Sequence, residues 1–363
     1  MHVFDLEELE SATDHFSPSQ LIGKGSHGSV YRGLLKDGNL AVAIKKQSLA
    51  LQKLRDNTKI ENEASILSSI PPNFSCLIDL LGVSHDAYGN KLIVTRHMPN
   101  GTLHEALHIS TTPPSWRKRV EIALRVAKGV RFLHESNPAI VHRDIKSANI
   151  LFDRSWSATL ADFGLAVRLD SKDAETKLPA GTIGYIDPSY TTPSKLSTKV
   201  DVFSYGVVLL ELISGRKAMD VNKSPPSIVE WALPLIQQGR AMEVCDKRVR
   251  MPSDVARTVK QMLSLAARCL STRESARPAM GEIVVSLEKL TIGPIQLSEP
   301  TNSSFRDIIV KMMGFRKFRF GGTVTKSGTC GDHDRGSGLS TNSGSISKGT
   351  LLVREILADI TLK

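Results

Sequence analysis

The chain has 363 residues, 40% of them hydrophobic, and a formal net charge of +10 at pH 7. It is long enough to bury a sizeable core and to form one two-lobed domain with extensions. Its four cysteines lie far apart without a CxxC pair, so neither a disulfide framework nor a zinc site is indicated.

No apolar run approaches the length of a membrane span, and the N-terminus lacks a signal-peptide profile. We therefore expect a cytoplasmic protein. Only 5% of the residues are aromatic, and no zinc-finger or RNA-recognition pattern occurs. The positive charge is interpreted as a solvated surface, and no nucleic acid partner is expected.

The first segment, residues 1–15, is predicted to be a short lead-in helix. Apolar residues recur along it at helical spacing with acidic residues between them, which is typical of an amphipathic helix. The apolar positions are Phe4, Leu6, Leu9, Ala12 and, just beyond, Phe16.

A glycine-rich run follows, Gly23-Lys24-Gly25-Ser26-His27-Gly28-Ser29-Val30, and then a strand, Val42-Ala43-Ile44-Lys45. Because glycine has no Cβ, such a run lets backbone amides approach anionic oxygens closely. Strand alternation sends Lys45 and Lys46 to opposite faces, so only one of them can reach a cleft beside the glycine run.

A helix is predicted over residues 57–70, closed by Pro71-Pro72, and two further strands should follow it. Glu61 and Glu63 lie about 200° apart around this helix, so they cannot both face the same side. From Gly101 onward the pattern becomes helical. Residues 207–213 are apolar nearly all round, as expected of a buried helix.

Two motifs thirteen residues apart dominate the middle of the chain: Val141-His142-Arg143-Asp144-Ile145-Lys146-Ser147-Ala148-Asn149, and then Asp162-Phe163-Gly164. Phosphoryl transfer needs a carboxylate at the attacking hydroxyl and oxygen ligands for magnesium. Asp144, Asn149 and Asp162 supply these groups.

Residues 293–363 are rich in serine, threonine and glycine, which predicts a largely flexible tail. Within it, Lys311–Phe320 interleaves basic and apolar residues. Two interpretations are open for this stretch: contact with an anionic membrane surface, or a solvated basic segment.

These motifs, in this order, resemble those of a eukaryotic protein kinase between about Phe16 and Ile292. The resemblance implies an α+β, two-lobed kinase fold, with a small β-rich N-lobe over residues 16–98 and a larger helical C-lobe over residues 99–292. Local phrases are similar to those of plant receptor-like and receptor-like cytoplasmic kinases, particularly the crinkly-type group. The phrases are Phe4–Ser17, Met98–Leu103, Gly181–Pro188 and Asp201–Gly206.

The resemblance implies that ATP is a cofactor. It selects Lys45 as the lysine at the phosphates and Glu63 as its partner, and it makes Thr95 the gatekeeper. Relatives mostly carry tyrosine and glutamate at positions 95 and 96. This chain departs from them with Thr95 and Arg96, and the departure concerns the local surface. The implied ATP-binding residues are Ile22, Gly23, Lys24, Gly25, Ser26, His27, Gly28, Val30, Ala43, Lys45, Glu63, Thr95, Arg96 and Met98.

By the same resemblance, Asp144 and Lys146 are catalytic: Asp144 orients the substrate hydroxyl, and Lys146 neutralises charge on the transferred group. Lys146 is the form of this loop found in serine/threonine kinases. Asn149 and Asp162 would hold Mg²⁺, or Mn²⁺ in its place, through oxygen.

In the family, the arginine matching Arg143 marks kinases whose activation loop is ordered by phosphorylation, because a loop phosphate gives the guanidinium a charged partner. In the activation loop, between Asp162 and Pro188, the candidate phosphate acceptors are Ser171, Thr176 and Thr182. In the family, the threonine matching Thr182 bonds the residues matching Asp144 and Lys146, which makes Thr176 the first choice.

One position departs from the family pattern. Ser189 stands where kinases carry a glutamate that pairs with a buried arginine, here Arg277. We therefore expect Arg277 to lose its partner, unless water or another carboxylate compensates, and Ser189 to loosen the substrate-binding segment.

The sequence thus predicts an ATP-dependent serine/threonine protein kinase with protein substrates and, through receptor-like signalling, receptor kinases as partners. Its location would be cytoplasmic, with peripheral attachment at the plasma membrane if Lys311–Phe320 binds lipid. The alternative is a nucleotide-binding scaffold that transfers little phosphate, although such proteins usually lack Lys45, Asp144 or Asp162.

Overall fold

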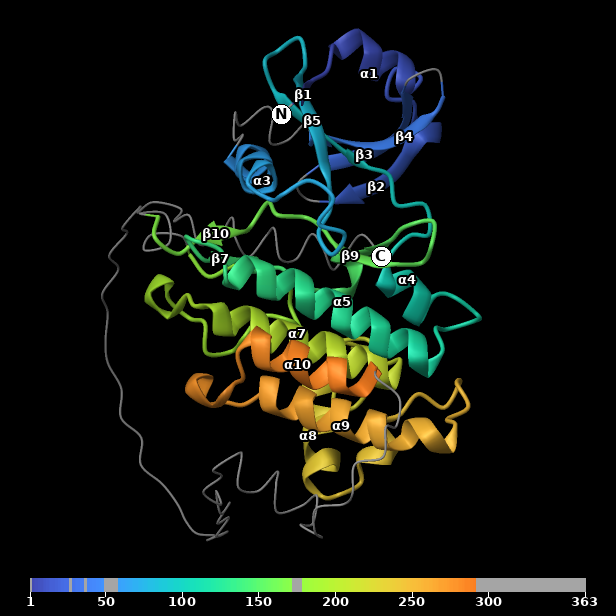
Figure 1. Ribbon diagram of the computed structural model, residues 1–363, viewed down its shortest axis with the longest axis vertical. Coiled ribbons are helices and arrows are strands. Elements are labelled where there is room, and N and C mark those ends of the chain that lie inside the picture. Colours follow the sequence, from blue (N-terminus) through green and yellow to red (C-terminus); the bar gives the residue numbers. More distant parts are fainter. Residues whose placement is uncertain (1, 26–27, 36–37, 49–57, 172–177, 292–363) are drawn as a thin grey trace, which may run out of the picture. The chain divides into compact units, whose positions relative to one another are not determined.

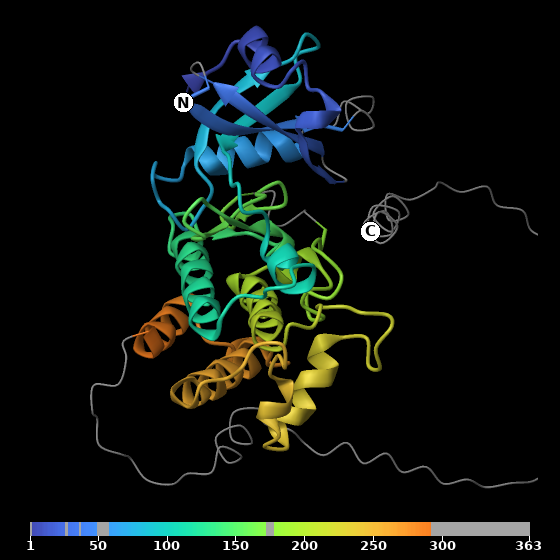
Figure 2. The same ribbon diagram turned by 90° about the vertical axis from the view of Figure 1, so that its right-hand side faces the viewer.

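The computed structural model describes residues 2–25, 28–35, 38–48, 58–171 and 178–291. Strands dominate its first part and helices the rest, as Figures 1 and 2 show. This arrangement confirms the predicted α+β fold with a sheet-based N-lobe and a helical C-lobe. Among the described residues, no helix is both long and apolar enough to cross a membrane.

The N-lobe is built on a six-stranded sheet with the order β1-β5-β6-β4-β3-β2. The pairs from β2 to β5 are antiparallel, and β1 runs parallel to β5. The strands are β1 His2–Val3, β2 Leu21–Gly25, β3 Gly28–Leu35, β4 Leu40–Gln47, β5 Leu80–His85 and β6 Lys91–Arg96.

The lead-in segment differs from its prediction, because it joins the sheet. Its first residues form β1, and its helix is limited to α1, Leu6–Ala12. A Cβ on Gly82 would lie 2.3 Å from the carbonyl oxygen of His2, so β1 can lie here only beside a glycine. The helix stops short of Phe16 since Asp14, His15 and Phe16 adopt positive φ angles.

One helix, α3 (Thr58–Ser68), covers a face of this sheet, within the predicted range of residues 57–70. Its inward face buries Ile60, Glu63, Ala64, Ile66 and Leu67. The buried glutamate is the exception in this apolar set. A buried carboxylate requires a partner, which the active site supplies.

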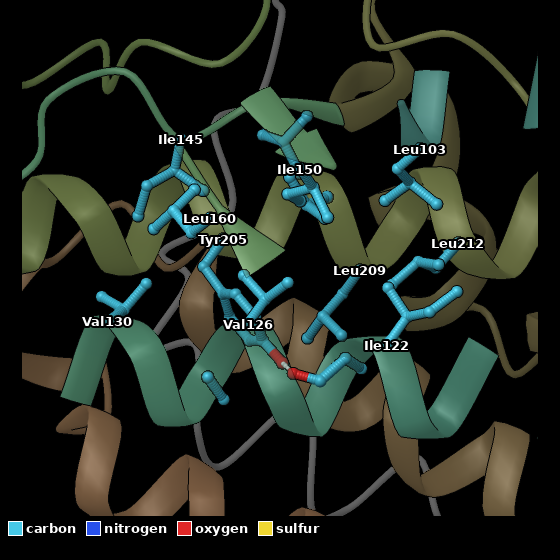
Figure 3. Packing of buried hydrophobic residues seen from close by; sticks show 14 of the residues in the cluster. Leu103, Ile122, Val126, Val130, Ile145, Ile150, Leu160, Tyr205, Leu209 and Leu212 are labelled. Atoms are coloured by element: carbon cyan, nitrogen blue, oxygen red, sulfur yellow. Dashed lines mark hydrogen bonds between the residues drawn. The ribbon is translucent and has the colours of Figure 1, made fainter. Parts of the chain in front are cut away.

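The C-lobe is organised around α5 (Trp116–His134) and α7 (Thr198–Ser214), whose facing side chains form the main core. Figure 3 shows Val126 and Ile122 of α5 opposite Leu209 and Leu212 of α7. Among the described residues, the other α-helices of the C-lobe are α4 Leu103–His108, α8 Ile228–Gln237, α9 Ser253–Cys269 and α10 Met280–Thr291.

Short strands on top of this core carry the two motifs. They are β7 Ile140–Val141, β8 Ile150–Phe152, β9 Ala158–Leu160 and β10 Val167–Arg168. Ile145, between Asp144 and Lys146, is fully buried and points into the core beside Leu160 (Figure 3). The loop bearing Asp144 is therefore anchored in the main core of the lobe.

Candidate active site

Lys45 of β4 lies between two carboxylates. Its Nζ is 2.6 Å from Glu63 Oε2 on α3 and 2.9 Å from Asp162 Oδ1. Glu61 faces away and pairs instead with Lys91. The structure thus brings Lys45 to the glutamate that the sequence singled out, and the neighbouring Lys46 lies over the Phe16 ring.

The charge balance at Lys45 favours the ammonium form. Burial alone would lower the pKa of this amine, but the charges of Asp162 and Glu63 outweigh burial and raise the pKa above its ordinary value. Lys45 is therefore fixed as a cation over the physiological pH range.

Asn62, which the sequence analysis did not identify, joins α3 to the second motif. Its Nδ2 donates to the carbonyl oxygens of Phe163 at 3.2 Å and Ala166 at 2.8 Å. Glu63 also accepts a hydrogen bond from the Phe163 amide at 3.4 Å. These bonds keep α3 against the Asp162 segment, and hence keep Glu63 at Lys45.

The glycine run forms the β2–β3 hairpin. Gly23, Lys24 and Gly25 pair with Val30, Ser29 and Gly28 respectively. A Cβ on Gly28 would lie 2.4 Å from the Lys46 carbonyl oxygen, so this position needs glycine. Ser26 and His27 lie outside the described residues. Ile22 is exposed, while Val30 and Ala43 are half-buried.

Thr95 and Arg96 end β6, and Met98 follows in the loop toward the C-lobe. The Thr95 hydroxyl lies 3.4 Å from the Ala43 carbonyl oxygen. The Arg96 guanidinium reaches outward to Asp79 at 3.2 Å. The arginine that departs from the family pattern is thus held by Asp79 at the N-lobe surface.

Asp144 lies at the centre of a polar cluster. Its Oδ1 accepts from the Thr182 hydroxyl at 2.6 Å, and its Oδ2 lies 2.9 Å from Lys146 Nζ. Lys146 also donates to Thr182 Oγ1 at 2.9 Å. Asn149 Nδ2 donates to Asp144 Oδ2 at 3.1 Å. The predicted catalytic residues therefore converge on one carboxylate.

The backbone of this loop is fixed from below by Asp201 of α7, another residue that the sequence analysis did not place in the site. Its carboxylate accepts from the amides of His142 and Arg143, each at 2.8 Å. Burial opposes ionisation of Asp201, but a hydrogen bond from His134 holds its pKa below the usual range. These bonds support the positive φ of Arg143, 69°.

The two motifs are joined by the β8–β9 hairpin, in which Ile150 faces Leu160. The Ala161 amide donates to the Asn149 carbonyl oxygen at 2.9 Å, so Asp162 and Asn149 lie at neighbouring ends of the hairpin. Since the Asn149 amide nitrogen is bonded to Asp144, its side-chain oxygen is oriented as an acceptor. This oxygen and the Asp162 carboxylate form a donor set that fits a hard divalent cation.

The Arg143 side chain is buried beside the activation loop. It donates to the Leu178 carbonyl oxygen at 2.5 Å and lies over the Tyr190 ring. Its Nε has no hydrogen-bond partner among the described residues. Burial lowers the pKa of this guanidinium. Ser171 donates to the Arg168 carbonyl oxygen at 2.7 Å, and Thr176 lies outside the described residues.

Of the outcomes left open for Arg277, the structure shows the one in which another carboxylate compensates for the missing glutamate. Arg277 Nη2 lies 3.0 Å from Asp187 Oδ1, and Nη1 contacts the other oxygen of the same carboxylate. Both side chains are 1% exposed. Asp187, two residues before Ser189, thus replaces the missing glutamate, and it also accepts from the Ser189 amide at 2.9 Å. Ser189 therefore does not leave the segment unpaired.

Comparison with known proteins agrees with this geometry. The family model described as "Protein kinase domain" matches residues 16–286. Serine/threonine-protein kinase-like protein At5g23170 of Arabidopsis thaliana is 45% identical over 91% of this chain and 99% of its own length. Proline-rich receptor-like protein kinase PERK8 of the same organism is 38% identical over 79% of this chain and 43% of its own length.

The matched range contains the glycine hairpin, the Lys45 and Glu63 pair, and both motifs, each in the geometry described above. Members of this family use ATP and a divalent metal ion to phosphorylate proteins. The chain belongs to the protein kinase family.

Proposed function

We propose that this chain transfers the γ-phosphoryl group of MgATP to serine and threonine hydroxyls of proteins. The observation that carries the proposal is the Asp144, Lys146 and Thr182 cluster, in which the three side chains contact one another at 2.6 to 2.9 Å. The relatives named as serine/threonine kinases support the same assignment.

Each residue has a proposed task. Asp144 orients the substrate hydroxyl and accepts its proton late in the reaction. Lys146, held at Asp144 by a 2.9 Å contact, offsets negative charge as it develops on the transferred group. Lys45 would contact the α and β phosphates, because Glu63 and Asp162 hold its ammonium in place.

Nucleotide binding rests on the N-lobe. The β2–β3 hairpin would place backbone amides over the phosphates, and Ile22, Val30 and Ala43 would pack on the adenine ring. The Arg96 carbonyl and the Met98 amide would bond its edge. Asn149 and Asp162 would hold Mg²⁺, which neutralises phosphate charge when bound.

Phosphoamino-acid analysis tests this function. After incubation with γ-labelled ATP, Mg²⁺ and a generic protein substrate, we expect label in phosphoserine and phosphothreonine. Label in phosphotyrosine alone would contradict the proposed hydroxyl preference. Bound ATP with no label on protein would favour the scaffold alternative.

We also propose that loop phosphorylation activates the enzyme. The position of Arg143 supports this regulation. Its guanidinium lies at Leu178, and its Nε has no hydrogen-bond partner among the described residues, so it would be available to bond a loop phosphate. Thr182 is bonded to Asp144, so phosphorylating it would bring two negative groups together. Thr176 therefore stays the first candidate acceptor, with Ser171 second.

Mass spectrometry of the chain after incubation with MgATP checks this proposal. We expect a phosphate within residues 170–177, and phosphatase treatment should lower activity. The Asp144→Asn variant, incubated in the same way, controls for phosphate added during expression. A fully active enzyme without a loop phosphate would contradict the proposal.

The wider biological setting is also a proposal. We propose a kinase domain over residues 16–292, a cytoplasmic location, and receptor-like signalling in which receptor kinases are partners. PERK8, a relative, is named as a receptor-like kinase, which supports this setting. The stretch Lys311–Phe320 and the tail 293–363 lie outside the described residues, so membrane contact stays a prediction from sequence.

A further inference from the structure

Three side chains with metal-binding atoms meet in the C-lobe, in contact with the base of the catalytic loop. His104 and His108 lie one turn apart on α4, and Glu211 comes from α7. Their candidate ligand atoms all lie within 4.8 Å of one another. The centroids of the two imidazole rings are 4.8 Å apart, and His108 Nε2 lies 2.9 Å from Glu211 Oε1.

We propose that His104, His108 and Glu211 form a binding site for Zn²⁺ or a similar transition metal. Two imidazoles and one carboxylate are a ligand set that zinc takes in proteins, with water in the fourth position. Zinc bonds of about 2.0 to 2.1 Å in a tetrahedral site place ligand atoms roughly 3.3 Å apart. The candidate ligand atoms lie within 4.8 Å of one another, so metal binding would require them to move to that spacing.

Burial favours a metal at this place. The side chains of His108 and Glu211 are 2% and 1% exposed, so the Glu211 carboxylate and the polar atoms of His108 are removed from water. A buried carboxylate is costly unless it is paired, and a divalent cation compensates it strongly. His104 is half-buried, which leaves a route by which a metal ion enters from the surface.

The carboxylate is also oriented as a ligand should be. Glu211 Oε2 accepts from the Tyr185 hydroxyl at 2.7 Å, and Oε1 lies 3.2 Å from the Ser147 hydroxyl. Such outer hydrogen bonds fix the position of a metal-binding carboxylate. Coordination through His108 Nε2 uses the tautomer that carries its proton on Nδ1.

The sequence from 104 to 108, His-Glu-Ala-Leu-His, has the spacing of a zinc protease motif, but the structure excludes that activity for its glutamate. Glu105 Oε2 accepts from the Thr102 amide at 2.7 Å and from the Thr102 hydroxyl at 2.9 Å. It serves as a helix cap and is not available as a general base. We therefore assign no hydrolytic activity to the proposed metal site.

Metal titration of the untagged full chain tests the proposal. The protein is stripped with a chelator and titrated with Zn²⁺ in excess Mg²⁺, so that Asn149 and Asp162 are occupied. We expect one bound Zn²⁺ whose affinity falls at least about tenfold in His104→Ala. Bound Co²⁺ should show the visible absorption of a tetrahedral complex, and His104→Ala should abolish it.

His85→Ala, which removes an exposed histidine of β5, is the matched control and should bind zinc as the wild type does. Melting curves without metal show whether His104→Ala is folded, and His104→Gln replaces it if it is not. Zinc binding of equal affinity in the wild type and the His104 variants would overturn the proposal, as would a wild type that binds no zinc.

Discussion

Replacing Asp144 by asparagine should lower the rate of phosphoryl transfer by about 10² to 10⁴, the usual contribution of a positioned general base. The carboxylate accepts from Thr182 at 2.6 Å and lies 2.9 Å from Lys146. An amide of the same size keeps the shape but cannot accept the substrate proton. It also turns an NH₂ group toward donors that the carboxylate now satisfies.

Steady-state rates with γ-labelled ATP measure this effect, and binding of a fluorescent ATP analogue should stay nearly unchanged. Asp254→Asn is the matched control, because Asp254 is 60% exposed and pairs with the exposed Arg117. That control should retain wild-type activity. If Asp144→Asn were as active as Asp254→Asn, Asp144 would not be the catalytic carboxylate.

Replacing Asp187 by asparagine should lower the free energy of unfolding by roughly 3 to 5 kcal/mol, because it leaves the Arg277 charge buried without its counterion. In the variant the guanidinium keeps uncharged partners, which include the carbonyl oxygens of Ser271 at 2.9 Å and Lys199 at 3.0 Å and the ring of Phe203. Chemical denaturation of the wild type and the variant measures the difference.

A second substitution separates lost charge from lost packing. In the double variant Asp187→Asn with Ser189→Glu, the new glutamate stands at the family position and should restore part of the stability. Ser189→Glu alone should leave the melting temperature unchanged or lower it, since Arg277 already has a carboxylate. The exposed pair of Asp254 and Arg117 again provides the control. Asp254→Asn should lower the free energy of unfolding by less than about 1 kcal/mol. If Asp187→Asn and Asp254→Asn lowered the free energy of unfolding equally, Asp187 would not be the counterion that stabilises the buried Arg277.

Local pattern was enough to predict much of this site. The choice of Glu63 over Glu61 depended on helical phase and family phrasing, and the structure places Glu63 at Lys45 and Glu61 at Lys91. The two motifs also come together as expected, because a short hairpin of β8 and β9 links them. Features fixed by residues close in sequence are those that a pattern predicts well.

Features that depend on the path of the chain in space were missed. The partner of Arg277 lies 90 residues away, and no local rule shows that Asp187 replaces the glutamate lost at Ser189. Asp201 is the exception that had a visible cue: it is an acidic residue in the first turn of a helix that carries a long apolar run, residues 207–210. A buried charge in such a position is usually bonded, and here it holds the catalytic loop.

Tertiary contact also explains the lead-in segment. A strand of two residues has no sequence pattern of its own, and β1 forms because Gly82 leaves room beside β5. The histidines of α4 were overlooked for a similar reason. The zinc criterion applied to the sequence counted cysteines, whereas the third proposed ligand, Glu211, comes from a distant helix.

A single-turnover experiment tests the central claim, that the assembled site transfers phosphate, most directly. Enzyme is loaded with stoichiometric γ-labelled ATP and Mg²⁺, mixed with excess protein substrate and quenched at intervals. We predict that close to one labelled phosphoryl group per enzyme moves to substrate serine or threonine while ADP forms in equal amount. Labelled ATP that stays bound and intact would contradict this account and identify the chain as a nucleotide-binding scaffold.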